Sequence, residues 1–359
     1  MSTTHAVFTP EQLSGFVARL QEWPATAWCG ADCELGVSPF TTFYFSYDST
    51  RATETAQLLV DIHEEFEALT GVKYEMCTHP GTTRPHPYGS KRLPDLRQFA
   101  KEVKADKHFS FDVSDSKNIA SSPVVGGYFW RNPAYMNDSD DPNRRCYSHI
   151  QLYHSWQWWL DNSSAWRRFL FSAIDRLKPQ QVYSGFAMAN PPAFGMRSEV
   201  SVWDRSLAMH FYGLDTDYPF SMGFGLTKGV RTPTWGFFLA DSWREELHCS
   251  REQVRLQLQH PKINITDFEN GQWIELGDAP GLYPVSAGVP ELPVRLNELL
   301  RPIRNNDLDL VGSGEWDGDP NVRFTASDSR RWLGRFDDGS DWPSADARMR
   351  PDALPDDIR

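Results

Sequence analysis

Strand-like and helix-like patterns alternate along this chain without the regular rhythm of a doubly wound parallel sheet. Thr42–Tyr47 is rich in aromatic residues and predicts a strand. The segment Thr50–Thr70 follows, with apolar residues on one helical face and Gly71 placed to end the helix. The glycine-rich turns that join strand to helix in doubly wound folds are missing. This irregular order predicts an α+β fold, with antiparallel or mixed sheets backed by helices.

The spacing of apolar residues, helix-like or strand-like, also predicts the remaining elements. The predicted strands are Val72–Cys77, His108–Val113, Val124–Trp130, His149–Tyr153, Tyr183–Ala189 and Thr234–Ala240. The predicted helices are Leu96–Lys104, Ser163–Leu177, Glu199–Gly213, Ser250–Leu258 and Leu292–Arg301. Polar and apolar residues alternate in His149–Tyr153, which predicts a strand with one face in water. His79–Pro94 is rich in proline and glycine and predicts a loop.

Two short patterns carry the most specific local predictions. Asn270-Gly271 separates the strand-like segments Lys262–Phe268 and Gln272–Leu276. Because both residue types tolerate positive φ, the pair predicts a tight hairpin turn. Ser250 and Gln253 have the spacing of a capping box, which predicts a helix start at Ser250.

Domain organisation follows from the order of elements and from a change in composition. Residues 1–304 predict one domain, in which segments of about 1–190 and 191–304 loosely repeat the order strand, helix, two strands, helix. Residues 305–359 carry 13 acidic residues, 7 arginines and no lysine, which gives half of the chain's net charge of −12. Trp316, Phe324, Trp332 and Phe336 lie in this acidic extension, which predicts that it packs on the body to about Phe336 and is mobile at its end.

The excess of acidic residues limits the classes of molecule that the chain can bind. A net charge of −12 repels nucleic acid and anionic membranes, whereas basic proteins remain open as partners. Five scattered cysteines do not form a disulfide framework. Met1–Glu11 lacks the pattern of a signal peptide, and no apolar stretch approaches the roughly 18 residues of a membrane span. We therefore expect a cytoplasmic protein.

No pattern in the chain predicts an active site, a metal site or a cofactor site. Cys29 and Cys33 have no second ligand pair downstream, which favours two ordinary buried thiols. His79 and His86 lie in the proline-rich loop, where solvated side chains are the ordinary outcome. The glycines of Met222–Val230 lack the Gly-Lys-Ser/Thr ending of a phosphate-binding loop. These observations favour a binding protein over an enzyme and predict no catalytic residue.

Several segments in the second half occur in the order of a known family. They are Val182–Ala189, Asp215–Pro219, Gly225–Gly236, the hairpin around Asn270-Gly271, and Leu292–Arg304. Within them the matching motifs read Ser184-Gly185-Phe186, Asp215-x-Asp217-x-Pro219, Gly225-Leu226-x-Lys228-Gly229-Val230 with Trp235, and Leu300-x-Pro302. In these motifs the chain resembles a bacterial family of type VI secretion immunity proteins, which are encoded beside effectors that carry a virus-type replication-repair (VRR) nuclease domain.

The resemblance runs from about Phe43 to Arg304 and is loosest before Cys146. Thr232-Pro233 is an insertion relative to the family pattern, and the acidic extension is a second departure. None of the matching motifs has the pattern of a catalytic site. The resemblance implies an inhibitor that binds a nuclease effector and covers its substrate groove, without a cofactor of its own.

Two acidic clusters are the predicted partner-binding residues. They are the loop residues Asp138, Asp140 and Asp141 and the extension residues Glu315, Trp316, Asp317 and Asp319. Exposed carboxylates attract a basic nuclease surface over long range. Three other interpretations are open: an immunity protein for an effector of another class, a metal-dependent enzyme that uses His79, His86 or the cysteines, and an adaptor of the secretion apparatus.

Overall fold

Twelve strands in the described residues form one open sheet. The computed structural model describes residues 9–29, 33–82, 84–141, 143–192, 197–216, 218–308, 324 and 326–343. The strands are β1 (Ala27–Cys29), β2 (Glu34–Phe45), β3 (Met76–Cys77), β4 (His86–Pro87), β5 (Phe109–Ser114), β6 (Gly126–Arg131), β7 (Ser148–Tyr153), β8 (Gln181–Met188), β9 (Leu214–Asp215), β10 (Gly236–Ala240), β11 (Ile263–Phe268) and β12 (Gly271–Leu276).

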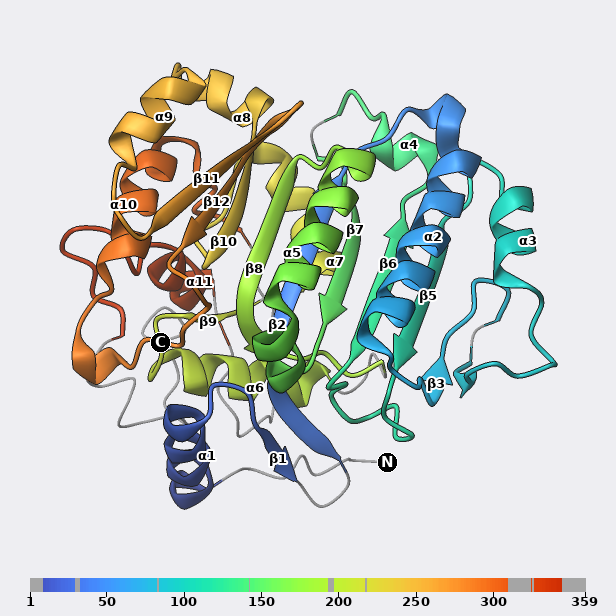
Figure 1. Cartoon of the computed structure of the whole chain (residues 1–359), viewed down its shortest axis with the longest axis horizontal. Helices are drawn as coiled ribbons and strands as arrows, with labels where there is room; N and C mark the ends of the chain where they lie inside the picture. Colours follow the sequence, from blue (N-terminus) through green and yellow to red (C-terminus); the bar gives the residue numbers. More distant parts are fainter. Residues whose placement is uncertain are drawn as a thin grey trace.

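The sheet runs in the order β11-β12-β10-β8-β2-β7-β6-β5-β3-β4, with β1 on β2 and β9 on β8 (Figure 1). All pairs are antiparallel except β8 with β9. Strands from both sides of residue 190 therefore join in one sheet. The predicted boundaries at residues 190 and 304 stay predictions.

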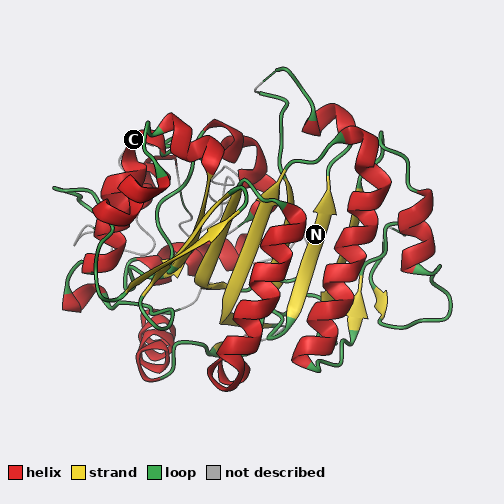
Figure 2. Cartoon of the chain, turned by 45° about the horizontal axis from the view of Figure 1, so that its top comes forward, coloured by secondary structure: helices red, strands yellow, loops and turns green. Residues whose placement is uncertain are grey.

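Eleven α-helices in the described residues pack on this sheet, so the fold is α+β, as predicted (Figure 2). They are α1 (Pro10–Glu22), α2 (Ala52–Thr70), α3 (Leu96–Glu102), α4 (Ala134–Asn137), α5 (Trp156–Leu177), α6 (Arg197–Ala208), α7 (Pro219–Gly225), α8 (Asp241–Glu246), α9 (Arg251–Gln257), α10 (Glu291–Leu300) and α11 (Ala326–Leu333). None of the helices in the described part of the chain has the length and apolar character that crossing a membrane requires.

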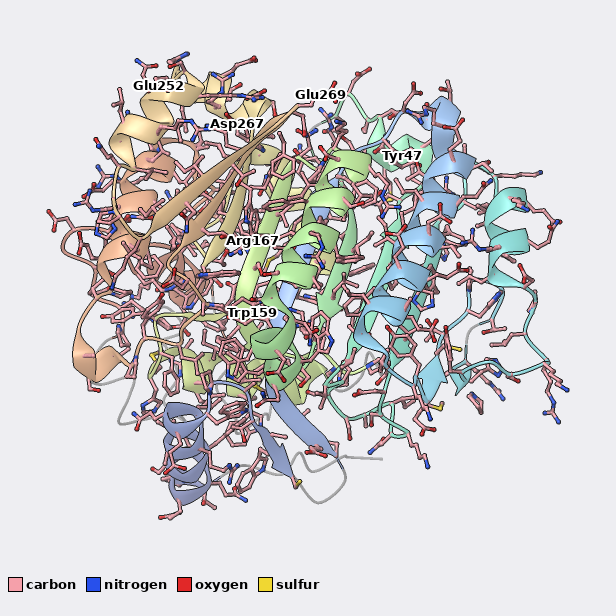
Figure 3. The ribbon with its side chains drawn as sticks, in the orientation of Figure 1. Tyr47, Trp159, Arg167, Glu252, Asp267 and Glu269 are labelled. Carbon is pink, nitrogen blue, oxygen red and sulfur yellow. The ribbon has the colours of Figure 1, made fainter. Side chains whose placement is uncertain are left out.

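The long helices α2 and α5 cover one face of the sheet (Figure 1). Gly71 ends α2 with φ of 64°, as predicted. Helix α5 begins seven residues earlier than predicted, because Ser155 caps it and a kink at Asn162 interrupts the apolar pattern. Two α5 side chains that Figure 3 labels reach the second half of the sheet: Arg167 forms a bidentate ion pair with Glu275 of β12 at 2.9 and 2.8 Å, and Trp159 packs against Trp235.

The opposite face carries the short helix α7, which contacts β2 and β7. The Tyr44 hydroxyl of β2 contacts the Met222 sulfur of α7 at 4.0 Å, and the Tyr147 N–H donates to the Gly223 oxygen. Because helices lie on both faces, all six residues of β7 are buried. The predicted wet face of this strand is therefore wrong: Gln151 and its polar neighbours face an enclosed layer.

The predicted hairpin exists, but its turn lies one residue earlier. Phe268 pairs with Gly271, so Glu269 and Asn270 form the loop and Gly271 begins β12. Neither Asn270 nor Gly271 has positive φ. A Cβ at Gly271 would lie 2.5 Å from the Leu239 oxygen of β10, so glycine is required there by the close approach of a neighbouring strand. The capping box of Ser250 and Gln253 is confirmed.

The described part of the acidic extension packs against α6 and the segment after it. Arg205 of α6 pairs with Asp328 of α11 at 2.8 Å, and both side chains are buried. Trp332 and Trp342 belong to the apolar core, and the Trp342 indole donates to the Ala208 oxygen at 3.3 Å. The predicted helix to Gly213 ends at Ala208 instead, and a short strand, β9, follows.

Candidate partner-binding surface

The residues considered for metal binding do not form a ligand cluster. In the described part of the chain, no three His, Cys, Asp or Glu side chains gather where they could hold a metal ion. His79 is buried, accepts a hydrogen bond from the Gly81 N–H at 3.0 Å and packs edge-on against Phe99, so the prediction that it is solvated is wrong. Cys29 is exposed and Cys33 is partly buried, which corrects the prediction of two buried thiols.

An aromatic groove lies beside α7, on the face of the sheet opposite α2. One hollow of about 280 Å³ is lined by Asp112, Tyr128, Trp130, Tyr218 and Phe220, among others. A second hollow of about 230 Å³ shares Trp130 and Phe220 and adds Tyr135. We use the name aromatic groove for these two hollows together.

The alternation of β6 places its aromatic residues in two environments. Phe129 packs against His63 of α2, with ring centroids 5.4 Å apart. Its neighbours Tyr128 and Trp130 therefore project from the other face of the sheet. Trp130 stacks with His108 at 5.3 Å and with His149 at 6.2 Å, and Phe220 of α7 meets it edge-on at 5.4 Å. The groove is thus built from three strands, β5, β6 and β7, and two helices, α7 and α4.

A buried ion pair fixes the segment that leads into α7. Arg231 donates to the Asp215 carboxylate at 2.6 Å and to the Thr216 oxygen at 3.0 Å. Its guanidinium lies 4.0 Å from the centroid of the Tyr183 ring in β8. Pro219 then occupies the first turn of α7, where its fixed φ suits a helix start. The ion pair and Pro219 together place Phe220 at the edge of the groove.

Asp112 and His149 are two of the groove residues whose pKa values are shifted. Burial raises the pKa of Asp112 to about 7, while the hydrogen bond from Thr78 acts in the opposite direction. Burial lowers the pKa of His149 to about 3, so its ring is neutral at pH 7. The groove therefore contains a carboxyl group that titrates near neutrality among apolar rings.

The predicted acidic loop adjoins the aromatic groove. Tyr135 lines the groove from α4, and Asp138 follows directly at the end of that helix. Asp138, Asp140 and Asp141 are all exposed. Their charge is partly offset, because Asp141 lies 3.7 Å from Arg144 and Arg145 is the next residue. That these three aspartates bind a partner stays a prediction.

The other predicted cluster belongs to the acidic extension. Glu315, Trp316, Asp317 and Asp319 lie outside the described residues.

The aromatic residues of the groove are absent from the sequence-based prediction. Phe220 is 49% exposed and Tyr135 is 67% exposed, which is unusual for large rings and marks a surface suited to recognition. The only sequence signal for them is the aromatic share of 13%. That share does not say which rings are left at the surface.

The chain is similar to known proteins over most of its length. A family model named TsiV, described as type VI immunity for VRR-NUC, matches residues 77–336. The solved structure of the Pseudomonas aeruginosa T6SS protein PA0821 is similar, with a TM-score of 0.76, 19% identity, and coverage of 96% of this chain and 97% of that one. At this identity the likeness concerns the fold. A comparison with curated proteins gave no match.

Proposed function

Because the chain belongs to the TsiV family, type VI immunity for VRR-NUC, we propose that it binds and neutralises a nuclease effector of the type VI secretion system. The family assigns the chain to immunity proteins, and it points to binding in place of catalysis. Neutralisation of a DNA-cleaving effector is the specific step that we propose.

The observation that carries the proposal is the aromatic groove beside the exposed acidic loop. Interfaces that bind tightly combine aromatic anchors at their centre with polar residues at their rim. Phe220 and Tyr135 supply large exposed rings, and Asp138, Asp140 and Asp141 supply rim charge. This arrangement suits a partner with a basic surface and shallow apolar contacts.

A DNA-cleaving effector has such a surface. It must present basic residues to phosphate, and its metal ion adds further positive charge. A chain with a net charge of −12 is attracted to that surface, which raises the association rate. In our proposal the immunity protein occupies the DNA-binding groove of the effector. It acts in the cytoplasm, where the DNA substrate is, and it needs no cofactor.

The test is a titration of the purified effector nuclease domain with this chain in a DNA-cleavage assay. We expect cleavage to stop near one immunity protein per nuclease and the complex to elute as one species in gel filtration. Phe220→Ser and Tyr135→Ser should weaken inhibition by about tenfold or more each, because they remove exposed anchors.

The matched control is Leu256→Ser, which removes a 62% exposed apolar side chain on α9, at the other end of the sheet. It should leave inhibition unchanged. A wild-type chain that neither binds the nuclease nor stops cleavage would refute the proposed function. If Phe220→Ser, Tyr135→Ser and Leu256→Ser weaken inhibition equally, the aromatic groove is not the interface.

A further inference from the structure

Asp112 lines the aromatic groove, and its carboxyl group has no cationic partner among the described residues. Its carboxylate accepts a hydrogen bond from the Thr78 hydroxyl at 3.0 Å, and its backbone N–H donates to the same hydroxyl at 2.9 Å. No arginine or lysine of the described residues forms an ion pair with it, and no nearby charge contributes to the shift of its pKa. Asp112 is partly buried, and a partly buried carboxylate with one neutral side-chain partner is less stable than one paired with a cation, so a bound cation would stabilise it.

The rings that line the same hollow suit a flat cation. Asp112 pairs with Tyr128 across β5 and β6, so both side chains lie on the groove side of the sheet. Trp130 and Phe220 complete this aromatic wall, and their centroids are 5.4 Å apart. Aromatic rings attract a guanidinium group through their negative faces, and a carboxylate matches its fork of N–H donors. A guanidinium is also less strongly hydrated than an ammonium group, so it enters such a hollow at lower cost.

We propose that this hollow receives one arginine side chain of the effector, whose guanidinium pairs with Asp112 between Tyr128, Trp130 and Phe220. This inference rests on the proposed function, because a DNA-binding nuclease supplies the arginine. Charge complementarity selects this occupant: the partner in the proposed function has a basic surface, and the hollow contains one carboxyl group that forms no ion pair with a described residue. The arginine would then be a central anchor, and the exposed aspartates of the loop would act at the rim.

The first test uses this chain alone with N-acetyl-arginine amide, and N-acetyl-citrulline amide as the neutral analogue of the same shape. Binding is followed through the indole N–H signal of Trp130 in NMR spectra, assigned with Trp130→Phe. We expect a dissociation constant on the order of millimolar for the arginine compound. The citrulline compound, and the arginine compound on Asp112→Asn, should bind at least about tenfold more weakly. Equal binding of the two compounds, no loss in Asp112→Asn, or no binding of the arginine compound would overturn the inference.

The second test uses the complex with the nuclease. Asp112→Asn keeps the hydrogen bond to Thr78 and removes only the charge, so the variant should fold. We expect its dissociation rate to rise about tenfold or more. The control is Glu252→Gln, an exposed acid on α9 that Figure 3 labels, which should dissociate at the wild-type rate.

The two proposals fail differently. If the wild-type chain does not bind the nuclease, the proposed function is refuted. If the wild-type chain binds and Asp112→Asn dissociates like Glu252→Gln, the function stands and the arginine site is refuted. A nuclease lysine that accounts for the whole effect of Asp112, in a double-mutant cycle, would also refute the choice of arginine.

Discussion

At the scale of single residues, a buried ion pair determines where the groove begins. Arg231 and Asp215 are almost fully buried and lie 2.6 Å apart. Asp215 belongs to one of the motifs that carry the resemblance, and Arg231 directly follows another, so these motifs have a structural role. Their role for the partner is indirect, because they position the start of α7 and with it Phe220.

We expect Arg231→Met to destabilise the fold by about 3–5 kcal/mol, because it removes the cation that donates a 2.6 Å hydrogen bond to the buried Asp215 carboxylate. Urea unfolding measures this change. The double variant Arg231→Met with Asp215→Leu should recover part of the loss, since neither charge of this pair is then buried. As a control, Arg51→Met breaks the exposed pair with Glu54 and should cost at most about 1 kcal/mol. A small loss in Arg231→Met would contradict this account of the pair.

Buried histidines, among them His63 and His154, make stability depend on pH. Burial lowers the pKa of His63 to about 4 and that of His154 to about 3, from the ordinary 6.5. The unfolded chain therefore takes up protons below pH 6.5 that the folded chain does not bind. The stability present above pH 6.5 is lost as the pH falls toward 4.

The measurement is the free energy of unfolding between pH 8 and 4. Each histidine should contribute a slope of up to about 1.4 kcal/mol per pH unit below its ordinary pKa. His154→Gln should be less stable at pH 8, because the Trp166 contact at 4.4 Å is lost, but its slope should be shallower. An unchanged slope in this variant would show that His154 does not titrate as described.

At the scale of elements, the turn after α7 packs closely against the segment after α10 because residue 229 is a glycine. The Val230 N–H donates to the Ile303 oxygen at 3.0 Å, and the Asn305 N–H donates to the Val230 oxygen at 2.8 Å. A Cβ at Gly229 would lie 2.7 Å from the Ile303 oxygen and 2.8 Å from the Asn305 nitrogen. The family-like glycine motif is thus explained by close packing of two backbones.

Gly229→Ala should therefore destabilise the chain by about 1–3 kcal/mol, since both contacting groups are backbone atoms. Gly15→Ala is the matched control. Gly15 lies inside α1, and a Cβ added there would have nothing within 4 Å, so alanine should stabilise the helix by about 0.5–1 kcal/mol. Thermal unfolding of the two variants should give shifts of opposite sign, and a shift of the same sign would contradict the packing argument.

At the scale of the whole molecule, net charge and local charge have different consequences for binding. The chain carries a net charge of −12, which attracts a basic partner from any direction. The acidic loop adds charge at one place, beside the aromatic groove. Long-range attraction acts on association, whereas buried anchors act on dissociation.

Replacing Asp138, Asp140 and Asp141 by Asn should slow association with the nuclease several-fold and reduce its salt dependence, with the dissociation rate nearly unchanged. The control replaces Glu245, Glu246 and Glu252 by Gln, which changes the net charge equally at the far end of the sheet. Stopped-flow measurements at several salt concentrations compare the two. Equal rates for both triple variants would show that the loop lies outside the interface.

The sequence by itself determined the α+β class, the end of α2 at Gly71, the capping box at Ser250 and the existence of the β11–β12 hairpin. These features depend on residues close together in the chain, so short-range periodicity and backbone preference reveal them. The family resemblance also came from local motifs, and the family match over residues 77–336 confirms it.

Only the tertiary structure decided the burial of both faces of β7, the close contact at Gly271 and the aromatic groove. Trp130 and Phe220 are 90 positions apart, and Asp112 is an ordinary strand residue until β6 and α7 enclose it. Whether a side chain is covered depends on which helices pack over the sheet, and periodicity along one strand cannot report a neighbour from a distant segment. The exposed aspartates could be found from the sequence, whereas the rings beside them required the fold.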